Sequence, residues 1–376
     1  MEITQTQTAT DPYPVYAEWR AKGPMVTDPD SGLTVATTAE AIRAVISDPD
    51  CTTRPRGQPV PPAIARTDAG AIFGRLVRMT DTPTATLAKQ AMIRAFRSVD
   101  PDALRQMAQA RTQSAIEAAG GQVNTQELAF SVPVEVIATQ LGFAPAQLAV
   151  IREHISNFVH CISPLSTPAQ IDLAQKASSD LIARTQEVLK RAEETLSSRM
   201  QHEMAPFIRV DPMVLIANLI GTMSQTFDAT AGLIGQSLVC MSRYPGPWTA
   251  QKTLDPAILQ AVATETARYD APIQNTRRFR PDGTAILLLL GSANRDPSAN
   301  PEPDRFDINR SGPICYTFSL QAHQCPGTAF ASAITTGVLA GCLEAGFVPQ
   351  RHVPDTIDYL QSTNARIPIL PAVSPH

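Results

Sequence analysis

The sequence lacks most of the features that would place it outside the cytoplasm. Its 376 residues include only six cysteines, which are scattered without a CxxC pair, so neither a disulfide framework nor a zinc module is indicated. The longest apolar run, from Ala285 to Gly291, is far too short to span a bilayer. The first residues have neither the basic nor the apolar region of a signal peptide. We therefore expect a cytoplasmic protein with no membrane partner.

The sequence also lacks a large excess of charge of one sign. It contains no segment that would mark a boundary between two domains. The net charge of −4 provides no basic field for nucleic acid. Hydrophobic residues make up 43% and charged residues 18%, which is typical of a folded chain with a real core. No repeat, low-complexity linker or charged tail divides the chain. We expect a single domain over residues 1–376 and no nucleic-acid partner.

Proline is plentiful, with 32 residues, and it separates segments of mostly helical pattern. Several segments begin at or near a proline, which suits the first helical turn, and several stop at glycine. The expected helices span 83–98, 101–120, 168–200, 212–244, 256–270 and 326–346. Strand-like segments are few: one near residue 32, one at 284–291, and ARIPILPA near the C-terminus. The pattern predicts a mainly α fold with a small β region.

Four short motifs follow one another in the C-terminal part of the chain. Glu265 and Arg268 are three residues apart, so a helix presents both on one side. An apolar strand follows at 284–291, and then a polar, proline-rich segment that contains Arg305. Last comes FSLQAHQCPG, a loop that carries Cys325 and leads into an alanine-rich segment. Each motif alone has an ordinary explanation, because an i,i+3 ion pair is usually solvated and a lone cysteine is usually a small buried residue.

Together the motifs resemble the C-terminal half of the cytochromes P450, the bacterial soluble ones in particular. That family shows a Glu-x-x-Arg helix, a meander with Arg-Phe, and the loop Phe-Gly-x-Gly-x-His-x-Cys-x-Gly. These are matched here by Glu265-Thr-Ala-Arg268, Asp304-Arg305-Phe306 and Phe318 to Gly327. GSANRDP also matches the family, and the resemblance extends upstream to 81–96 and 230–238. It implies the cytochrome P450 fold, a triangular helical prism around heme b (iron protoporphyrin IX).

The resemblance assigns roles around this haem. Cys325 is the expected iron ligand, because a thiolate pushes electron density onto haem iron and favours O–O cleavage. The expected cofactor-binding residues are Lys89, Arg278 and His323 toward the propionates, and Phe318 and Gly327 beside the sulfur. A partly buried charge cluster with a structural role is expected behind the cysteine loop, formed by Glu265, Arg268 and Arg305. Without the family context, Lys89 and Arg278 are explained as surface cations and His323 as a capping residue.

Three positions around the cofactor depart from the family pattern. Ser319 and Gln321 replace two glycines, which permit unusual backbone angles, so we expect a locally altered loop. Ala85 stands where many relatives place a propionate-binding histidine. One contact to the haem is therefore expected to be lost.

The largest departure lies in the helix expected opposite Cys325. The family pattern Ala-Gly-x-Asp/Glu-Thr-Thr, whose acid and first threonine deliver protons to bound dioxygen, is replaced by Gln225-Thr226-Phe227-Asp228-Ala229-Thr230. The acid survives and the first hydroxyl does not. Proton delivery needs a donor or a water within hydrogen-bond reach, so Thr226, a water linked to Asp228, or a polar group of the substrate could replace that hydroxyl. The candidate catalytic positions are Thr226, Asp228, Ala229 and Thr230.

The expected substrate pocket combines this helix with other segments. Its members are Gln225, Phe227, Ile273, Gln274 and Asn275, with Ile72, Phe73 and Thr363 as further positions. Ile72 and Phe73 are equally explained as ordinary core. Gln225 and Thr226 replace the smallest residues of the family nearest the haem, so the pocket roof is expected to be narrower and more polar. This favours a small or polar substrate.

Three functions remain open on the sequence alone. The first is a monooxygenase that oxidises a small organic molecule with O2 and electrons from a separate ferredoxin or flavodoxin reductase system, as in the secondary metabolism of many bacterial relatives. Arg94, Arg97 and Arg105 form either a basic docking patch for this carrier or a simply solvated face. The second is an atypical P450 that catalyses oxidative coupling or cyclisation, desaturation or another reaction without the threonine relay. A peroxide-driven version is disfavoured because QTFDATAG contains no arginine. The third is a haem-binding protein without turnover.

Overall fold

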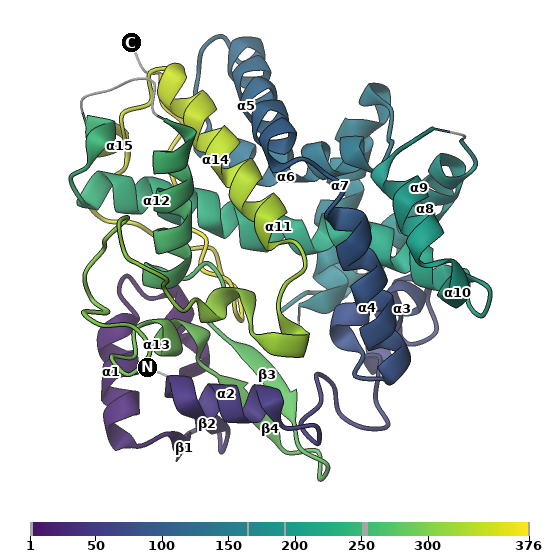
Figure 1. The fold of residues 1–376 in the computed structure, drawn as a ribbon, viewed down its shortest axis with the longest axis horizontal. Coiled ribbons are helices and arrows are strands. Elements are labelled where there is room, and N and C mark those ends of the chain that lie inside the picture. Colours follow the sequence, from purple (N-terminus) through teal and green to yellow (C-terminus); the bar gives the residue numbers. More distant parts are fainter. Residues whose placement is uncertain (1–2, 164, 192, 250–254, 375–376) are drawn as a thin grey trace.

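The structure is a computed structural model that describes residues 3–163, 165–191, 193–249 and 255–374. Helices make up most of it, and a four-stranded sheet with α1 and α2 lies toward one corner (Figure 1). The helices of the first half are α1 (Tyr13–Lys22), α2 (Ala39–Ser47), α3 (Asp68–Phe73), α4 (Pro83–Phe96), α5 (Pro101–Ala118), α6 (Thr125–Gln140), α7 (Leu148–Phe158) and α8 (Pro168–Leu189). Those of the second half are α9 (Leu196–Glu203), α10 (Ala205–Ile208), α11 (Met213–Arg243), α12 (Pro256–Tyr269), α13 (Leu290–Asn294), α14 (Thr328–Glu344) and α15 (Pro349–His352).

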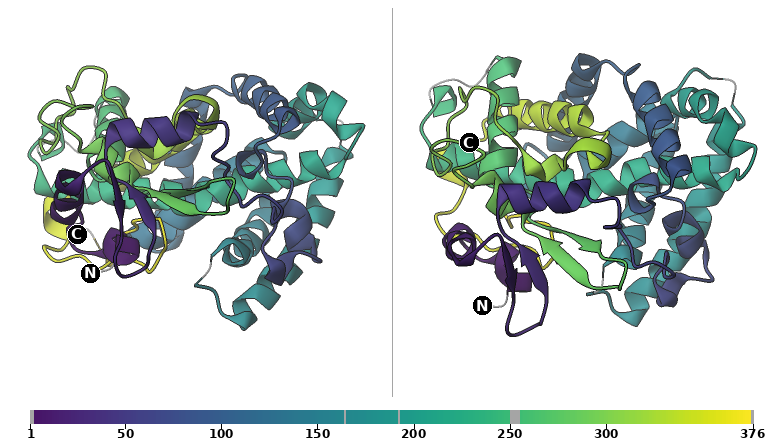
Figure 2. Two further views of the ribbon diagram at one scale, coloured as in Figure 1. Left: turned by 90° about the horizontal axis from the view of Figure 1, so that it is seen from below. Right: turned by 60° about the horizontal axis from the view of Figure 1, so that its bottom comes forward.

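The small sheet joins the two ends of the sequence. Its order is β1 (Met25–Thr27), β2 (Thr34–Ala36), β4 (Ala285–Leu288) and β3 (Thr276–Phe279). β2 pairs in parallel with β4, while the two outer pairings are antiparallel. Figure 2 shows α2 alongside this sheet. The pairing holds the N-terminal segment against the C-terminal half of the chain, so that both contribute to one cavity wall.

The long helix α11 runs through the interior of the molecule (Figure 1). It spans 31 residues, most of them buried, and it packs against α6, α12, α14, α3 and α8. A helix that is apolar nearly all round can only be stable when other elements cover every face. The sequence of α11 therefore requires a central position, and this position sets one wall of the site described below.

Most of the predicted helices are confirmed, and proline stands in their first turn as expected. Side chains of Thr82, Asp100, Thr167 and Asp255 cap α4, α5, α8 and α12 at backbone N–H groups that the helix itself leaves unpaired. The segment 168–200 forms two helices instead of one, because Thr195 caps a separate α9. Residue 192, between them, lies outside the described residues.

The β region is mainly as predicted, but β4 ends at Leu288, before the end of the predicted segment, and ARIPILPA forms no strand. The segment near residue 32 and the start of 284–291 form β2 and β4. ARIPILPA makes only isolated bridges, Ile273 with Ala365 and Tyr359 with Pro368, because no neighbouring segment continues the pairing. The prediction of a mainly α fold with a small sheet is confirmed. Among the described residues, no helix combines the length and the apolar character needed to cross a membrane.

Candidate haem-binding site

A cavity of about 960 Å³ lies between α11 and the loop that precedes α14. Its wall is formed by α4, the middle of α11, β3, the segment 46–62 and the loop 317–327. The volume falls at the upper end of the range usual for ligand pockets, so it is large enough for more than one small molecule. Cys325 faces this cavity on one side, and Ala229 of α11 lines it as well.

Backbone contacts hold Cys325 in place. Its N–H donates to the carbonyl oxygen of Phe318 at 2.8 Å, and the Thr328 hydroxyl donates to its carbonyl oxygen at 3.0 Å. Burial raises the pKa of the Cys325 thiol, while the Gly327 N–H and the charges of Arg78 and Lys89 oppose this rise. α14 begins at Thr328, so its N-terminal end also lies near the sulfur. The surroundings thus contain the groups that favour a thiolate, although burial alone disfavours it.

The cysteine loop has positive φ angles at both positions where the sequence replaces an expected glycine. Ser319 has φ 56° and ψ −174°, and Gln321 has φ 52°, both in regions that L side chains rarely adopt. Both replaced positions thus adopt glycine-like backbone angles, and the expectation of an altered loop stays a prediction. The Gln321 side chain accepts a hydrogen bond from the Ser47 hydroxyl at 2.9 Å, which fastens the loop to α2. The Ser319 hydroxyl is buried with no partner among the described residues.

Cationic side chains gather on the cavity wall next to this loop. Lys89 donates from Nζ to the carbonyl oxygen of Ala322 at 2.6 Å. Arg278 is 5% exposed, and its Nε has no hydrogen-bond partner among the described residues. Burial and the neighbouring Arg278 and Lys89 charges lower the pKa of His323 to about 4. Ala85 lines the same cavity without a polar group.

This cluster fits the carboxylates of a porphyrin. A buried guanidinium nitrogen without an acceptor costs free energy, as does a cluster of like charges. Lys89, Arg278 and His323 all line the cavity. An anionic group bound there would accept a hydrogen bond from the guanidinium and reduce the repulsion between the like charges. The Cys325 sulfur lines the same space. The residues present therefore fit a haem with an axial thiolate and two anionic side groups.

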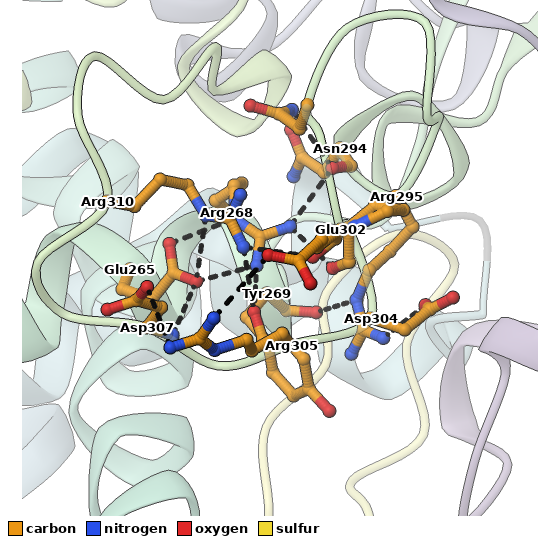
Figure 3. A network of polar contacts seen from close by, with 12 residues as sticks. Glu265, Arg268, Tyr269, Asn294, Arg295, Glu302, Asp304, Arg305, Asp307 and Arg310 are labelled. Atoms are coloured by element: carbon orange, nitrogen blue, oxygen red, sulfur yellow. Dashed lines mark hydrogen bonds and ion pairs between the residues drawn. The ribbon is translucent and has the colours of Figure 1, made fainter.

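A buried charge network supports the cysteine loop from behind (Figure 3). Glu265 and Arg268 are almost fully buried and form a two-pronged pair, with N–O distances of 2.9 and 2.6 Å. Arg268 also donates to the carbonyl oxygens of Asn294 and Pro303. These bonds join α12, α13 and the meander into one unit.

The third cation of the network is Arg310, in the place that we expected for Arg305. Arg310 Nε lies 3.4 Å from Glu265 Oε1, and its other nitrogens donate to three backbone carbonyls. The Arg305 side chain is exposed and pairs with Glu302 and Asp307 (Figure 3). Arg305 takes part only through its carbonyl oxygen, which accepts from Arg268 at 3.1 Å.

The α11 wall contains most of the predicted catalytic positions. Gln225, Thr226, Ala229 and Thr230 line the cavity. The Thr226 hydroxyl donates to the carbonyl oxygen of Thr222 at 2.8 Å, so only its oxygen lone pairs remain available. Ala229 offers no polar side-chain atom to the cavity.

Asp228 does not line the cavity and has no ion pair among the described residues. Partial desolvation by surrounding protein raises the pKa of its carboxyl, yet the side chain remains exposed to water. We give more weight to the exposure, because water that reaches a carboxyl restores much of its hydration. An accessible carboxyl of raised pKa is suited to exchange protons with solvent.

Two predicted pocket residues point elsewhere. Phe227 is buried against Phe130, with ring centroids 4.7 Å apart, because its side of α11 faces α6. Gln274 is fully buried and donates to the Tyr13 hydroxyl and the carbonyl oxygen of Ala271. Neither lines the cavity, so these two predictions are wrong.

The remaining predicted pocket positions are divided between the cavity and the core. Ile273, Asn275 and Phe73 line the cavity. Ile72 is core, with 0% exposure. Thr363 contributes its carbonyl oxygen, which accepts from the Asn275 amide at 3.0 Å.

Sequence reasoning missed three arginines of the cavity wall: Arg277, which is exposed at its edge, and Arg54 and Arg78. The Arg54 guanidinium stacks 3.5 Å from the centre of the Phe73 ring and donates to the carbonyl oxygens of Pro59 and Phe73. Arg78 belongs to the short 3₁₀ helix η3 (Val77–Met79). No motif surrounds either residue, and only the tertiary arrangement brings them to the cavity.

The expected basic docking patch is partly neutralised. Arg94 pairs with Glu203 at 2.6 Å, and Arg105 pairs with Asp102 at 3.0 Å. Arg97 ends α4 on an exposed surface. The patch therefore keeps less positive charge than its sequence indicates.

Comparison with known proteins shows which chains this one is similar to. The chain is 26% identical over 347 residues to the cytochrome P450 monooxygenase PikC of Streptomyces venezuelae, covering 86% of this chain and 81% of that protein. Its fold matches the crystal structure of CalO2 with a TM-score of 0.83 at 17% identity, over 99% and 98% of the two chains. The chain is a homologue of the bacterial cytochromes P450. No family model matches its sequence.

The predicted P450 fold is confirmed by these structural neighbours. A further one is the P450 enzyme CxnD for C–S bond formation in chuangxinmycin biosynthesis, with a TM-score of 0.76 at 19% identity over 97% and 96% of the chains. P450 enzymes are oxidoreductases that use haem, O2 and a redox partner. The cavity between α11 and the cysteine loop is the candidate site for such a cofactor.

Replacing Arg310 with methionine should destabilise the protein far more than the same change at Arg305. Loss of the Arg310 side chain leaves Glu265 with less compensation in a buried network, a change that costs about 2–4 kcal/mol, whereas an exposed ion pair contributes about 0.5 kcal/mol. The measurement is chemical denaturation of both variants beside the wild type. Equal losses in the two variants would show that Arg305 shares the supporting role.

Replacing Ser319 with glycine should stabilise the protein by about 1 kcal/mol. Glycine adopts the observed backbone angles without strain, and this gain exceeds the added flexibility of the unfolded chain. Gln324→Gly is the matched control, because Gln324 has an ordinary φ of −53° and should lose stability on the same change. A loss of thermal stability in Ser319→Gly would mean that the serine side chain makes a compensating contact.

Proposed function

We propose that this chain is a haem-thiolate monooxygenase that oxidises a small, polar organic substrate. A single domain over residues 1–376 would bind heme b, and electrons would come from an external ferredoxin or flavodoxin reductase system in the cytoplasm. Its similarity to PikC supports a role in secondary metabolism. The observation that carries the proposal is one cavity lined by the Cys325 sulfur, a cluster of buried cations and the middle of α11.

The chain's own groups would hold the cofactor in a defined orientation. Cys325 would ligate the iron, with the Gly327 N–H and the end of α14 stabilising the negative sulfur. Lys89 and Arg278 would pair with the propionates, and Phe318 would cover the sulfur. When bound, the haem supplies the activation of O2, which no side chain of this chain can supply.

Proton supply differs from that of relatives with a threonine in the middle of the distal helix. Ala229 leaves a gap on the cavity wall, between Thr226 one turn earlier and the next residue, Thr230. The Thr226 oxygen can accept a hydrogen bond from a water in this gap, while its own proton is directed at Thr222. Asp228 is exposed but does not line the cavity, so a further water would have to connect it to the water in this gap. We propose that this path replaces the missing hydroxyl.

A second candidate is an atypical P450 that catalyses oxidative coupling or cyclisation, desaturation or another non-hydroxylating reaction. It is favoured by the absence of a side-chain hydroxyl at Ala229, because such reactions do not all need a proton relay of the usual kind. The similarity in fold to CxnD, a P450 named for C–S bond formation, is compatible with it. Products identified by mass spectrometry distinguish the two, since only hydroxylation or epoxidation adds one oxygen atom.

The reduced, carbon monoxide-bound spectrum tests the thiolate. The wild type should show the band typical of thiolate-ligated haem, and Cys325→Ser should lose it. Cys315→Ser is the control, because Cys315 is half-buried nearby but does not line the cavity. A colourless wild-type protein, or a spectrum typical of histidine ligation, would contradict the proposed function.

Replacing Ala229 with threonine tests the proposed proton path. A hydroxyl at this position should lower the amount of peroxide released per NADH consumed several-fold, because a fixed donor makes proton transfer more efficient. Ala229→Val is the control, since valine has the same shape without the hydroxyl. If both variants change the peroxide yield equally, the effect is steric and Ala229 serves to make room.

A further inference from the structure

Arg78 lies on the α11 side of the cavity. The 3₁₀ helix η3, which contains it, is fastened to α11 by Asn218: the Val77 N–H donates to Asn218 Oδ1 at 3.0 Å, and Asn218 Nδ2 donates to the carbonyl oxygen of Arg75 at 2.9 Å. Asn218 itself is almost fully buried. This attachment fixes η3 to the wall that carries Ala229 rather than to the cysteine loop.

The face of α11 next to η3 continues into the cavity. Asn218, Thr222, Gln225 and Ala229 follow at intervals of four, three and four residues, so they share one face of the helix. The last three line the cavity, as does Arg78. Gln225 forms no side-chain hydrogen bond with the described residues. Arg78 and Gln225 are therefore polar groups on adjoining parts of the same wall, both available to a ligand.

Arg78 has no counter-ion among the described residues. Its one polar contact runs from Nε to the Met79 sulfur, at 3.3 Å. It lines the cavity, where desolvation lowers its pKa and the nearby Cys325 sulfur opposes this shift. Asp81, the carboxylate on this wall, is already bound by the N–H and hydroxyl of Thr53, at 2.7 and 2.6 Å. Arg54 adds a repelling charge instead of a partner.

The charge of the whole cavity wall exceeds what a porphyrin needs. Five lysine and arginine side chains line it, Arg54, Arg78, Lys89, Arg277 and Arg278, against two aspartates, Asp48 and Asp81. The surplus is three positive charges without counting histidine. The two propionates of a protoporphyrin would neutralise two of them, and a thiolate is balanced by the ferric porphyrin core. One positive charge remains for another ligand.

Position decides which cation is left over. Lys89 is bonded to the cysteine loop at Ala322, and Arg278 lies close enough to Lys89 to lower its pKa, so these two form one group beside that loop. Arg54 is held by Phe73 and two backbone carbonyls. The backbone next to Arg78 is attached to α11, while its side chain lies close enough to Arg278 and Cys325 to interact with their charges. Arg277 is exposed at the edge of the cavity, so Arg78 is the remaining wall cation without an ion pair to a described carboxylate.

We propose that the substrate of this site carries a carboxylate, and that Arg78 binds this group with help from the Gln225 amide. The inference rests on the proposed function, because it places the substrate between α11 and a haem. An arginine matches the two oxygens of a carboxylate, and hydrogen bonds between two charged groups are stronger than those between neutral groups. Arg78 then determines specificity and substrate orientation.

The test compares matched acids and amides on the haem-loaded protein. Octanoate is titrated against octanamide, and benzoate against benzamide, following both the shift of the haem absorption band and the heat of binding. Wild type should bind at least one acid about 10- to 100-fold more tightly than its amide, as expected for a hydrogen bond to a charged partner. Arg78→Met, which keeps the length of the side chain, should remove this preference and leave amide binding unchanged.

Arg277→Met is the matched control, because Arg277 is an exposed cation at the edge of the same cavity and should leave the preference intact. The proposal is overturned if wild type binds no acid more tightly than its amide, or if Arg78→Met keeps the preference. It is equally overturned if Arg78→Met loses haem, since Arg78 would then serve a propionate. A wild type without the thiolate spectrum would refute the proposed function instead, and the calorimetric titration still measures the acid preference.

Discussion

The structure depends on holding a sulfur atom and several cations on the walls of one cavity that contains few compensating acids. Charges of this kind are costly to remove from water, and they remain in place only where the surrounding backbone cannot move away. The Glu265–Arg268–Arg310 network supplies this rigidity, because it ties α12, α13 and the meander behind the cysteine loop. The loop before α14 and the strand β3 then present Cys325 and Arg278 from fixed directions. The cavity is therefore suited to bind an anionic ligand.

Sequence reasoning predicted the parts of the site that a short motif determines. The order of Glu265, Arg268 and Cys325 predicted the fold and placed the sulfur in the cavity, because those residues act through their immediate backbone context. Proline at helix starts predicted α4, α5, α12 and α14 with bounds close to those observed. Local signals of this type are independent of what the chain meets elsewhere.

The errors concern residues whose role depends on distant neighbours. Arg305 and Arg310 both lie in the meander, and the path of the backbone alone decides which one reaches Glu265. Phe227 and Gln274 lie beside true cavity residues in sequence but face α6 and Tyr13. Arg54 and Arg78 belong to no motif. Ser319 shows the converse case, since the fold imposes a glycine-like conformation on a residue that does not favour it.

The double hydrogen bond of Asn218 makes η3 and α11 one mechanical body. A shift of α11 would therefore carry the backbone of η3, and with it the Cα of Arg78, in the same direction. The remainder of such a molecule would meet other parts of the cavity wall, among them β3 and the helix α4. Such an arrangement would select ligands by their carboxylate and would accept different structures in the rest of the molecule.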